Sequence, residues 1–215
     1  MINGGAYNRA SGVGSTVGGY SNIASGAYSA VGGGNSNFAT NSYTCVPGGY
    51  GGNAINYGQF AFAGNFFSAQ GDGQYVQQVL YADAYNGNTV ALTPEKSNVD
   101  PSLYGSTSIL NDSETEMVAM YTIQVLGFDD SDNFSQAMRK VVIRKRATNT
   151  WHEEIVHIES IGTDVTDAGG ISFFINTNSS PYHTFAISGG SNSDDNTRWL
   201  ANVQGLWLYK PPAYP

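Results

Sequence analysis

The chain has 215 residues, a formal net charge of -8 and a single cysteine. One cysteine excludes a disulfide framework, and 17 acidic against 9 basic residues argue against binding to nucleic-acid phosphates. No run of about 18 apolar residues could span a bilayer, and the first residues lack the pattern of a signal peptide. We therefore expect a soluble chain of one or two domains, with no export signal of its own, no nucleic-acid partner and no membrane insertion.

Glycine divides the chain into two parts of different composition. Eighteen of the 27 glycines fall within residues 1–74, where Arg9 and Asp72 are the only charged side chains. The later part is dense in charge, as in the basic run 144–146. We predict a domain boundary near residues 71–73, with a Gly-rich repeat region at 1–73 and a second domain at 74–215.

The Gly-rich part contains a short repeat. The pattern G-G-x-x-N-x-A-x-G-x-x-S-x-V starts at Gly4, returns at Gly18 and again at Gly33, with degraded copies over 48–71. In the third copy Asn41 replaces the second glycine position, as Asn can where φ is positive. A spacing of 14 to 15 residues is typical of a β-solenoid with two short strands per coil, and the glycines argue against a helix. A flexible linker would not hold Asn, Ala and Val in register.

The apolar side chains of such coils must be covered. Each coil offers mainly Ala and Val, and a repeat of this kind cannot bury its apolar face alone. We therefore predict three chains around a common axis, with Val17, Val31 and Val46 pointing inward as the trimer core. Cys45 lies where other coils carry Ala30 or Thr16, so we interpret it as a small buried apolar side chain.

The repeat also resembles known proteins. The segment from Gly18 to Val31, GGYSNIASGAYSAV, resembles the head repeats of trimeric autotransporter adhesins, and similar repeats occur in bacteriophage tail fibres and tailspikes. The resemblance covers about a third of the chain. It implies a left-handed parallel β-roll assembled as a homotrimer.

From residue 74 onward the apolar residues recur with a period of two, which predicts strands. Turn clusters rich in Gly, Asn and Asp separate them, so we expect an antiparallel β-sandwich, jelly-roll-like, in an all-β protein. Trp199 and Trp207 fall on the apolar face of the last strand and are predicted core residues. The predicted strands are 75–81, 89–92, 106–110, 117–125, 135–146, 151–161, 171–175, 182–188 and 199–209.

This second part resembles another family. A Gly-Asp-Gly-Gln start, a basic strand at 138–146 and the closing segment 198–203, RWLANV, are similar to the C-terminal domain at the ends of many phage tail fibre proteins. The resemblance implies a β-sandwich tip that follows a repeat region.

Residue types that carry chemistry are scattered. His152 and His157 are five apart in a predicted strand and should face opposite sides unless a bulge intervenes. Glu153 and Glu154 are strand neighbours, so they cannot form a glycosidase pair with each other. The acidic run 129–132 lacks the Gly and the distal Glu of an EF-hand loop. With no nucleophile elbow, P-loop or zinc motif, we expect no catalytic residue, no metal and no cofactor, and thus not an enzyme.

One basic cluster stands out in the acidic chain. Arg139, Lys140, Arg144, Lys145 and Arg146 could attract phosphate or acidic sugars of a bacterial envelope. They could also protect an edge strand from aggregation, and we favour that interpretation.

Together these features predict a phage tail fibre tip located in the virion. The resemblances imply that it is made in the host cytoplasm, is extracellular when assembled, and contacts other tail proteins. We expect its function to be multivalent binding to a host cell-surface receptor, a glycan or a protein, through loops. The candidate contact residues lie in three turns: Phe128, Asp129, Asp130, Asp132 and Asn133; Asn178 and Tyr182; Asn192, Asp194 and Asp195.

Three alternatives stay open at this point. The chain could be a structural trimerisation module whose adhesive partner is another chain. It could be a fragment of a tailspike that depolymerises polysaccharide, or the head of a bacterial adhesin.

Overall fold

The computed structural model shows an all-β protein. It describes residues 1–85, 90–94, 117–129, 134–145, 151–159, 172–176, 184–188 and 196–209, and these contain strands and turns but no helix. Accordingly, no membrane-spanning helix occurs among the described residues. The short strands are β1 (Arg9–Ala10), β2 (Thr16–Val17), β3 (Ile23–Ala24), β4 (Ala30–Val31), β5 (Phe38–Ala39), β6 (Cys45–Val46), β7 (Asn53–Ala54) and β8 (Phe60–Phe62). The later strands are β9 (Gly73–Tyr85), β10 (Val90–Ala91), β11 (Met117–Asp129), β12 (Phe134–Lys145), β13 (Trp151–Glu159), β14 (Ser172–Asn176), β15 (Thr184–Ser188) and β16 (Asn196–Tyr209).

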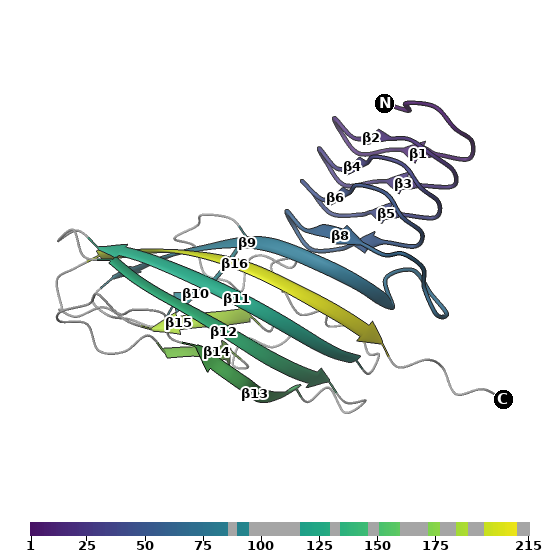
Figure 1. Ribbon diagram of the computed structural model, residues 1–215. Coiled ribbons are helices and arrows are strands. Elements are labelled where there is room, and N and C mark those ends of the chain that lie inside the picture. Colours follow the sequence, from purple (N-terminus) through teal and green to yellow (C-terminus); the bar gives the residue numbers. More distant parts are fainter. Residues whose placement is uncertain are drawn as a thin grey trace.

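The repeat region is a stack of coils with two short strands each (Figure 1). Strands β1, β3, β5 and β7 pair in parallel along one side of the stack, and β2, β4, β6 and β8 along the other. The register advances by one repeat per coil: Ala10 pairs with Ala24, Ala24 with Ala39, and Ala39 with Ala54. The pairing has the predicted spacing of 14 to 15 residues per coil, while the left-handed β-roll stays a prediction.

The valines that we expected at a threefold axis lie elsewhere. Val17, Val31 and Val46 are each at most 1% exposed within a single chain, where they form one core with the alanines of the opposite strands. The coil is wide enough to enclose a Val and an Ala by itself, so these side chains leave no surface for another chain to contact. The prediction that they meet across chains was wrong, and any contact between chains must use other residues.

Buried asparagines join successive coils. The side-chain oxygen of Asn22 accepts the backbone N–H of Asn37 at 2.8 Å, and that of Asn37 accepts the N–H of Gly52 at 2.8 Å. Each side-chain amide also donates to glycine carbonyls of its own coil and of the next one, as Asn37 does to Gly33 and Gly49 at 3.0 Å. Both asparagines have no exposed surface, and a buried polar group is tolerated because it is fully hydrogen-bonded. This explains why the repeat has Asn at that position.

The corners of the coils need unusual backbone geometry. Gly34 has a φ of +78°, and a Cβ at that position would lie 2.1 Å from the carbonyl oxygen of Gly49 in the next coil. Left-handed corners also occur at non-glycine residues, among them Tyr28 and Tyr43. Asn41 has no positive φ, so the explanation that Asn replaces Gly there because φ is positive was wrong. Gly26, its counterpart one coil earlier, is needed because a Cβ there would meet the backbone of Asn41 at 1.8 Å.

The coil sheet continues directly into the second part of the chain. β8 pairs with β9 in antiparallel fashion, and the nine-stranded sheet has the order β13-β12-β11-β16-β9-β8-β6-β4-β2. Two glutamines on β9 fasten it to the last coil, because Gln74 exchanges hydrogen bonds with the backbone of Asn53 and Gln78 donates to the carbonyl of Tyr57. One hydrogen-bonded surface therefore crosses the predicted boundary at residues 71–73.

The inner face of the long strands forms the core of the second part. Tyr121 and Trp199 lie over glycines of neighbouring strands, where a Cβ at Gly205 or Gly127 would come within 2.5 Å of their rings. A three-stranded antiparallel sheet, β10-β15-β14, supplies Phe185, whose ring meets Tyr121 edge-on at 5.5 Å. The predicted strands in this region are confirmed except 106–110, which lies outside the described residues. The jelly-roll connectivity stays a prediction.

The close packing of coils generates a first prediction. Replacing Gly34 by Ala should lower the free energy of unfolding by about 3 kcal/mol or more, because its Cβ collides with a backbone oxygen and its φ is left-handed. Gly33→Ala is the matched control: a Cβ there meets nothing within 4 Å, so the change should stay within about 0.5 kcal/mol. Urea unfolding of both variants measures the difference, and equal midpoints would contradict the stacked-coil geometry.

The core of the second part generates another prediction. Trp207 Nε1 donates to the Tyr121 hydroxyl at 2.7 Å, so Tyr121→Phe leaves a buried donor unpaired and should cost about 1–3 kcal/mol. Burial raises the pKa of Tyr121 because the folded protein favours the neutral phenol. The contribution of Tyr121 to the free energy of unfolding should therefore be complete below about pH 10, the ordinary tyrosine pKa, and be lost as the pH rises further. Urea unfolding at pH 7 and at alkaline pH tests both effects. Tyr81→Phe, at a 40% exposed residue, is the control and should change little.

Candidate functional site

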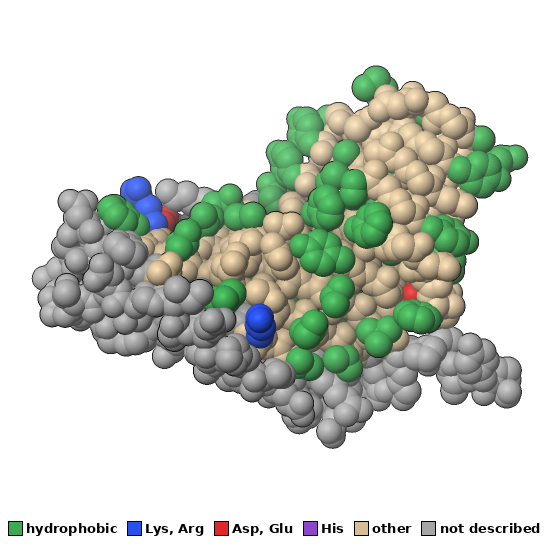
Figure 2. Space-filling view, in the orientation of Figure 1, with side chains coloured by type: hydrophobic (Ala, Val, Ile, Leu, Met, Phe, Trp, Pro, Cys, Tyr) green, Lys and Arg blue, Asp and Glu red, His purple; other side chains and the backbone are tan. Residues whose placement is uncertain are grey.

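The outer face of the nine-stranded sheet exposes apolar side chains that nothing in the described chain covers. Figure 2 shows hydrophobic side chains gathered over this sheet and continuing onto the coils. They form two groups along the strands. The coil-end cluster, nearest the coils, consists of Phe62, Tyr75, Val118, Met120, Leu206 and Leu208. The outer-end cluster, at the far end of the same strands, consists of Val79, Tyr81, Leu126, Phe128 and Leu200.

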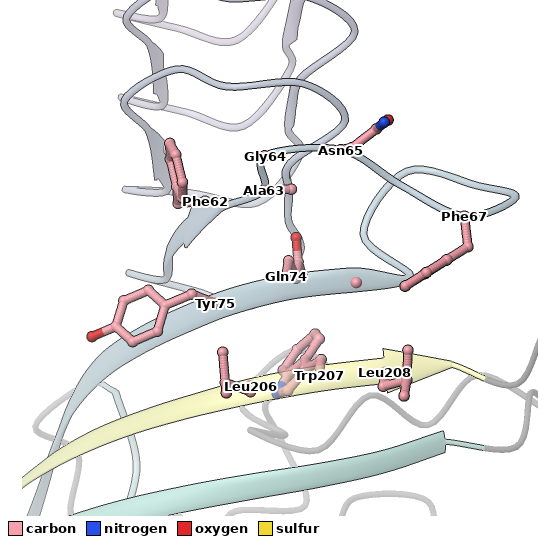
Figure 3. Close-up of a pocket in the computed structure, with 11 residues that line it drawn as sticks. Phe62, Ala63, Gly64, Asn65, Phe67, Gln74, Tyr75, Leu206, Trp207 and Leu208 are labelled. Atoms are coloured by element: carbon pink, nitrogen blue, oxygen red, sulfur yellow. The ribbon is translucent and has the colours of Figure 1, made fainter.

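The register of the strands brings the coil-end cluster together. Val118 pairs with Leu208 and Met120 with Leu206, while Tyr75 on β9 pairs with both Leu206 and Phe62. Leu206, Leu208 and Met120 are 50–52% exposed. The cluster borders an open groove of about 430 Å³ between the last coil and the sheet (Figure 3). The groove is lined largely by apolar and backbone surface, with Asn65 and Gln74 as polar residues at its rim and floor.

A polar belt separates the two clusters. Gln77 donates to the side-chain oxygen of Asn202 at 3.2 Å, and Asn202 donates to Gln124 at 3.2 Å, so three amides on three adjacent strands form a chain of hydrogen bonds. These amides face outward beside the leucines. The outer face thus alternates apolar, polar and apolar surface along the strand direction.

Two of the three predicted contact turns are flanked by strand ends that lie side by side. Phe128 pairs with both Phe134 and Arg198, and Asn196 pairs with Tyr85, so the strand ends around 130–133 and 189–195 share one end of the sheet. Phe128 is 54% exposed there. The strand ends that flank the third turn differ: Asn176 pairs with Thr184 where β14 ends and β15 begins, and β15 runs from there toward the shared end (Figure 1).

The remaining predicted contact residues cannot be placed. Asp129 is the last residue of β11 and pairs with Thr197, but its side chain lies outside the described part. The other candidates all lie outside the described residues: Asp130, Asp132, Asn133, Asn178, Tyr182, Asn192, Asp194 and Asp195.

The basic strand is not at an edge. β12 lies between β11 and β13, with hydrogen-bonded partners on both sides, so the edge-strand interpretation of 139–146 was wrong. Lys140 is exposed on the outer face. The histidine argument held only without a bulge, and a register shift is present after Lys140 of β12, where His152 and His157 pair with Arg144 and Lys140. The histidine side chains lie outside the described part.

The coils carry rows of exposed aromatic rings at their corners. Tyr28 stacks on Tyr43 with ring centroids 5.4 Å apart, and Tyr43 meets Tyr57 at 5.1 Å. A second row includes the pair Tyr7 and Tyr20 at 5.3 Å. The first row follows from the coil spacing, which places the same corner position of each coil above the next, whereas Tyr7 lies one position past Ala6, the coil counterpart of Tyr20. The rings pack mainly on each other.

The described residues show no arrangement suited to catalysis. Cys45 is half-buried on the outward side of the coils, and burial raises the pKa of its thiol, which disfavours a nucleophilic thiolate. The carboxylate of Asp72 accepts backbone N–H groups from Phe67, Ser68 and Ala69, so its oxygens serve the turn before β9. Within the described part of the chain, no group of three or more potential metal ligands occurs.

Sequence reasoning placed the inner face correctly but overlooked the outer one. Trp199 and Trp207 are 3% and 2% exposed, which confirms them as core residues. The outer leucines alternate with them, so the segments 117–121 and 206–208 are apolar at every position. Such uninterrupted apolar runs are typical of strands covered on both faces. The sequence therefore contained the information that both faces of these strands are apolar.

No protein-family model matches the chain, and no curated protein is significantly similar to it. Among solved structures, the chain is similar to the tailspike protein of Acinetobacter phage vB_ApiP_P1, with 10% identity, a TM-score of 0.35, and coverage of 93% of this chain and 42% of that one. It is also similar to the tailspike protein gp49 of Acinetobacter baumannii bacteriophage Fri1, described as a capsular polysaccharide depolymerase, with 9% identity, a TM-score of 0.29, and coverage of 90% and 41%. The chain thus spans about two fifths of each of these proteins.

Proposed function

We propose that the chain is the outer part of a homotrimeric phage tail fibre or tailspike, located in the virion tail, that binds a glycan or protein on the host cell surface. Binding without catalysis is part of this proposal, as are a left-handed coil and a sandwich-type tip. The observation that supports it is one continuous sheet running from the coil stack into long strands, where the end of β11 lies beside the start of β16, the strand ends next to two of the predicted contact turns.

This geometry suits attachment. Loops carried by a rigid scaffold can vary in sequence while the scaffold keeps their positions. Phe128 offers an exposed aromatic ring at the shared strand end, and Arg198 is its cross-strand neighbour. An aromatic face next to polar and charged groups is a common way to bind a sugar ring or a polar peptide. No such combination occurs at the coil-end cluster among the described side chains.

Three copies would strengthen a weak contact. When several sites on one particle engage one surface, the second and third contacts form at high effective concentration, and overall affinity can exceed that of one site by about 10²–10⁴. A modest contact at each outer end is therefore sufficient for firm attachment.

The prediction is that the full chain, added in excess, blocks adsorption of the phage that carries it. Phe128→Ala should raise the concentration needed for half inhibition about tenfold, because loss of one aromatic contact costs about 1.4 kcal/mol per site. Plaque-based adsorption assays with purified chain give this number.

Phe67→Ala is the matched control, since Phe67 is 74% exposed but lies in the turn between β8 and β9, beside the groove near the coils. It should compete as well as the unmodified chain. Absence of any competition at saturating concentration would reject receptor binding and favour a purely structural module.

A further inference from the structure

We infer that the coil-end cluster is the contact surface between copies of this chain. The inference deepens the proposed function and rests on its trimeric assembly: it names the residues through which the copies meet. These residues replace the valines Val17, Val31 and Val46, which the coils bury internally.

The first argument is that these strands are apolar on both faces. In β16, Trp207 faces the core and is 2% exposed, while its neighbours Leu206 and Leu208 face outward and are 52% and 50% exposed. In β11, Met117 and Ala119 are buried and Val118 and Met120 are exposed. An antiparallel sheet with one solvated face normally carries polar residues there, whereas a sheet covered on both faces does not. The sequence thus fits a sheet that is covered on its outer face, and no described residue of the chain provides that cover.

The second argument is size. Five half-exposed residues at about 80–100 Å² each present about 450 Å² of apolar surface, a size typical of the largest patch on a monomeric protein, of about 300–600 Å², which is often functional. Interfaces are about 57% apolar, so such a core corresponds to about 800 Å² per partner, which is the size of a standard stable contact. The polar belt of Gln77, Gln124 and Asn202 is placed to form its rim.

The third argument concerns what the surface can accept. The cluster is mainly aliphatic and includes no charged side chain, so it offers little that would orient a sugar or a charged ligand. A second copy presents the same uncharged surface, and like-charge repulsion does not oppose its approach.

Continuity with the coils supports the same partner. The outward positions of β4, β6 and β8 carry Ala30, Cys45 and Phe60, all partly buried, and the ring of Phe60 meets that of Tyr75 edge-on at 6.4 Å. Phe60 and Phe62 lie on the same face as Tyr75. The surface therefore extends from the tip sheet onto a side of the coils with small residues, where another coil stack can approach closely.

The test is the molar mass of the full chain in solution by light scattering. The unmodified chain should have three times the chain mass of 22.8 kDa, and Leu206→Lys should reduce it to one chain, because a lysine would be buried unpaired in the contact. Leu200→Lys is the matched control: the same residue type, on the same strand and face, but in the outer-end cluster. It should keep the full mass. A trimer that survives Leu206→Lys overturns the inference.

A second measurement covers the case in which Leu206→Lys fails to fold, which a shift in Trp199 and Trp207 fluorescence would reveal. In a Cys45→Ser background, Leu206→Cys should react with a thiol reagent at least about tenfold more slowly than Leu200→Cys, since a contact shields it. Equal rates overturn the inference. So does a protected Leu206→Cys in a monomeric chain, because the cover would then come from the chain itself.

The outcomes separate the two proposals. A monomeric unmodified chain that still blocks adsorption overturns this contact surface and leaves receptor binding intact. A trimer that Leu206→Lys disrupts, but that never competes for adsorption, confirms the contact surface and rejects receptor binding.

Discussion

The stacking of one coil on the next is the constraint on which the rest of the structure depends. Neighbouring coils approach so closely that Gly34 has no room for a Cβ, and the buried Asn22 and Asn37 satisfy backbone groups of two coils at once. Stacking fixes the register of β2, β4, β6 and β8, and β8 is the strand on which β9 pairs. The coils therefore determine the position of the long strands in the second part, and the long strands determine the orientation of the exposed outer face.

Much of this fold could be predicted from the sequence. Asn, Ala and Val at fixed spacing from Gly18 onward gave the coils and their register, and alternating residues gave nearly all the later strands. The error about Val31 has a simple physical origin. Sequence shows that a valine needs burial but not how wide a coil is, and one chain proved wide enough to enclose it.

The outer surface was harder to predict. Pairing partners are not encoded locally, so nothing in residues 139–146 shows that their strand lies inside the sheet. The apolar runs at 117–121 and 206–208 did contain the information that both faces are apolar. Of the predicted contact residues, Phe128 is placed at the shared strand end, because two strand registers bring Phe134 and Arg198 beside it. A surface formed by three strands distant in sequence cannot be assembled from spacing alone.

The pairing of β8 with β9 also determines how the molecule responds to a pull. Three residue pairs, from Phe60 and Gln77 to Phe62 and Tyr75, join coils and long strands, and Gln74 adds bonds to Asn53. A tension applied along the long strands acts perpendicular to these hydrogen bonds, which must shear together instead of opening one after another. Torque is likewise transmitted through the sheet without a swivel. In the proposed attachment role, a particle tethered through such a joint would be held at a fixed angle to the surface it touches.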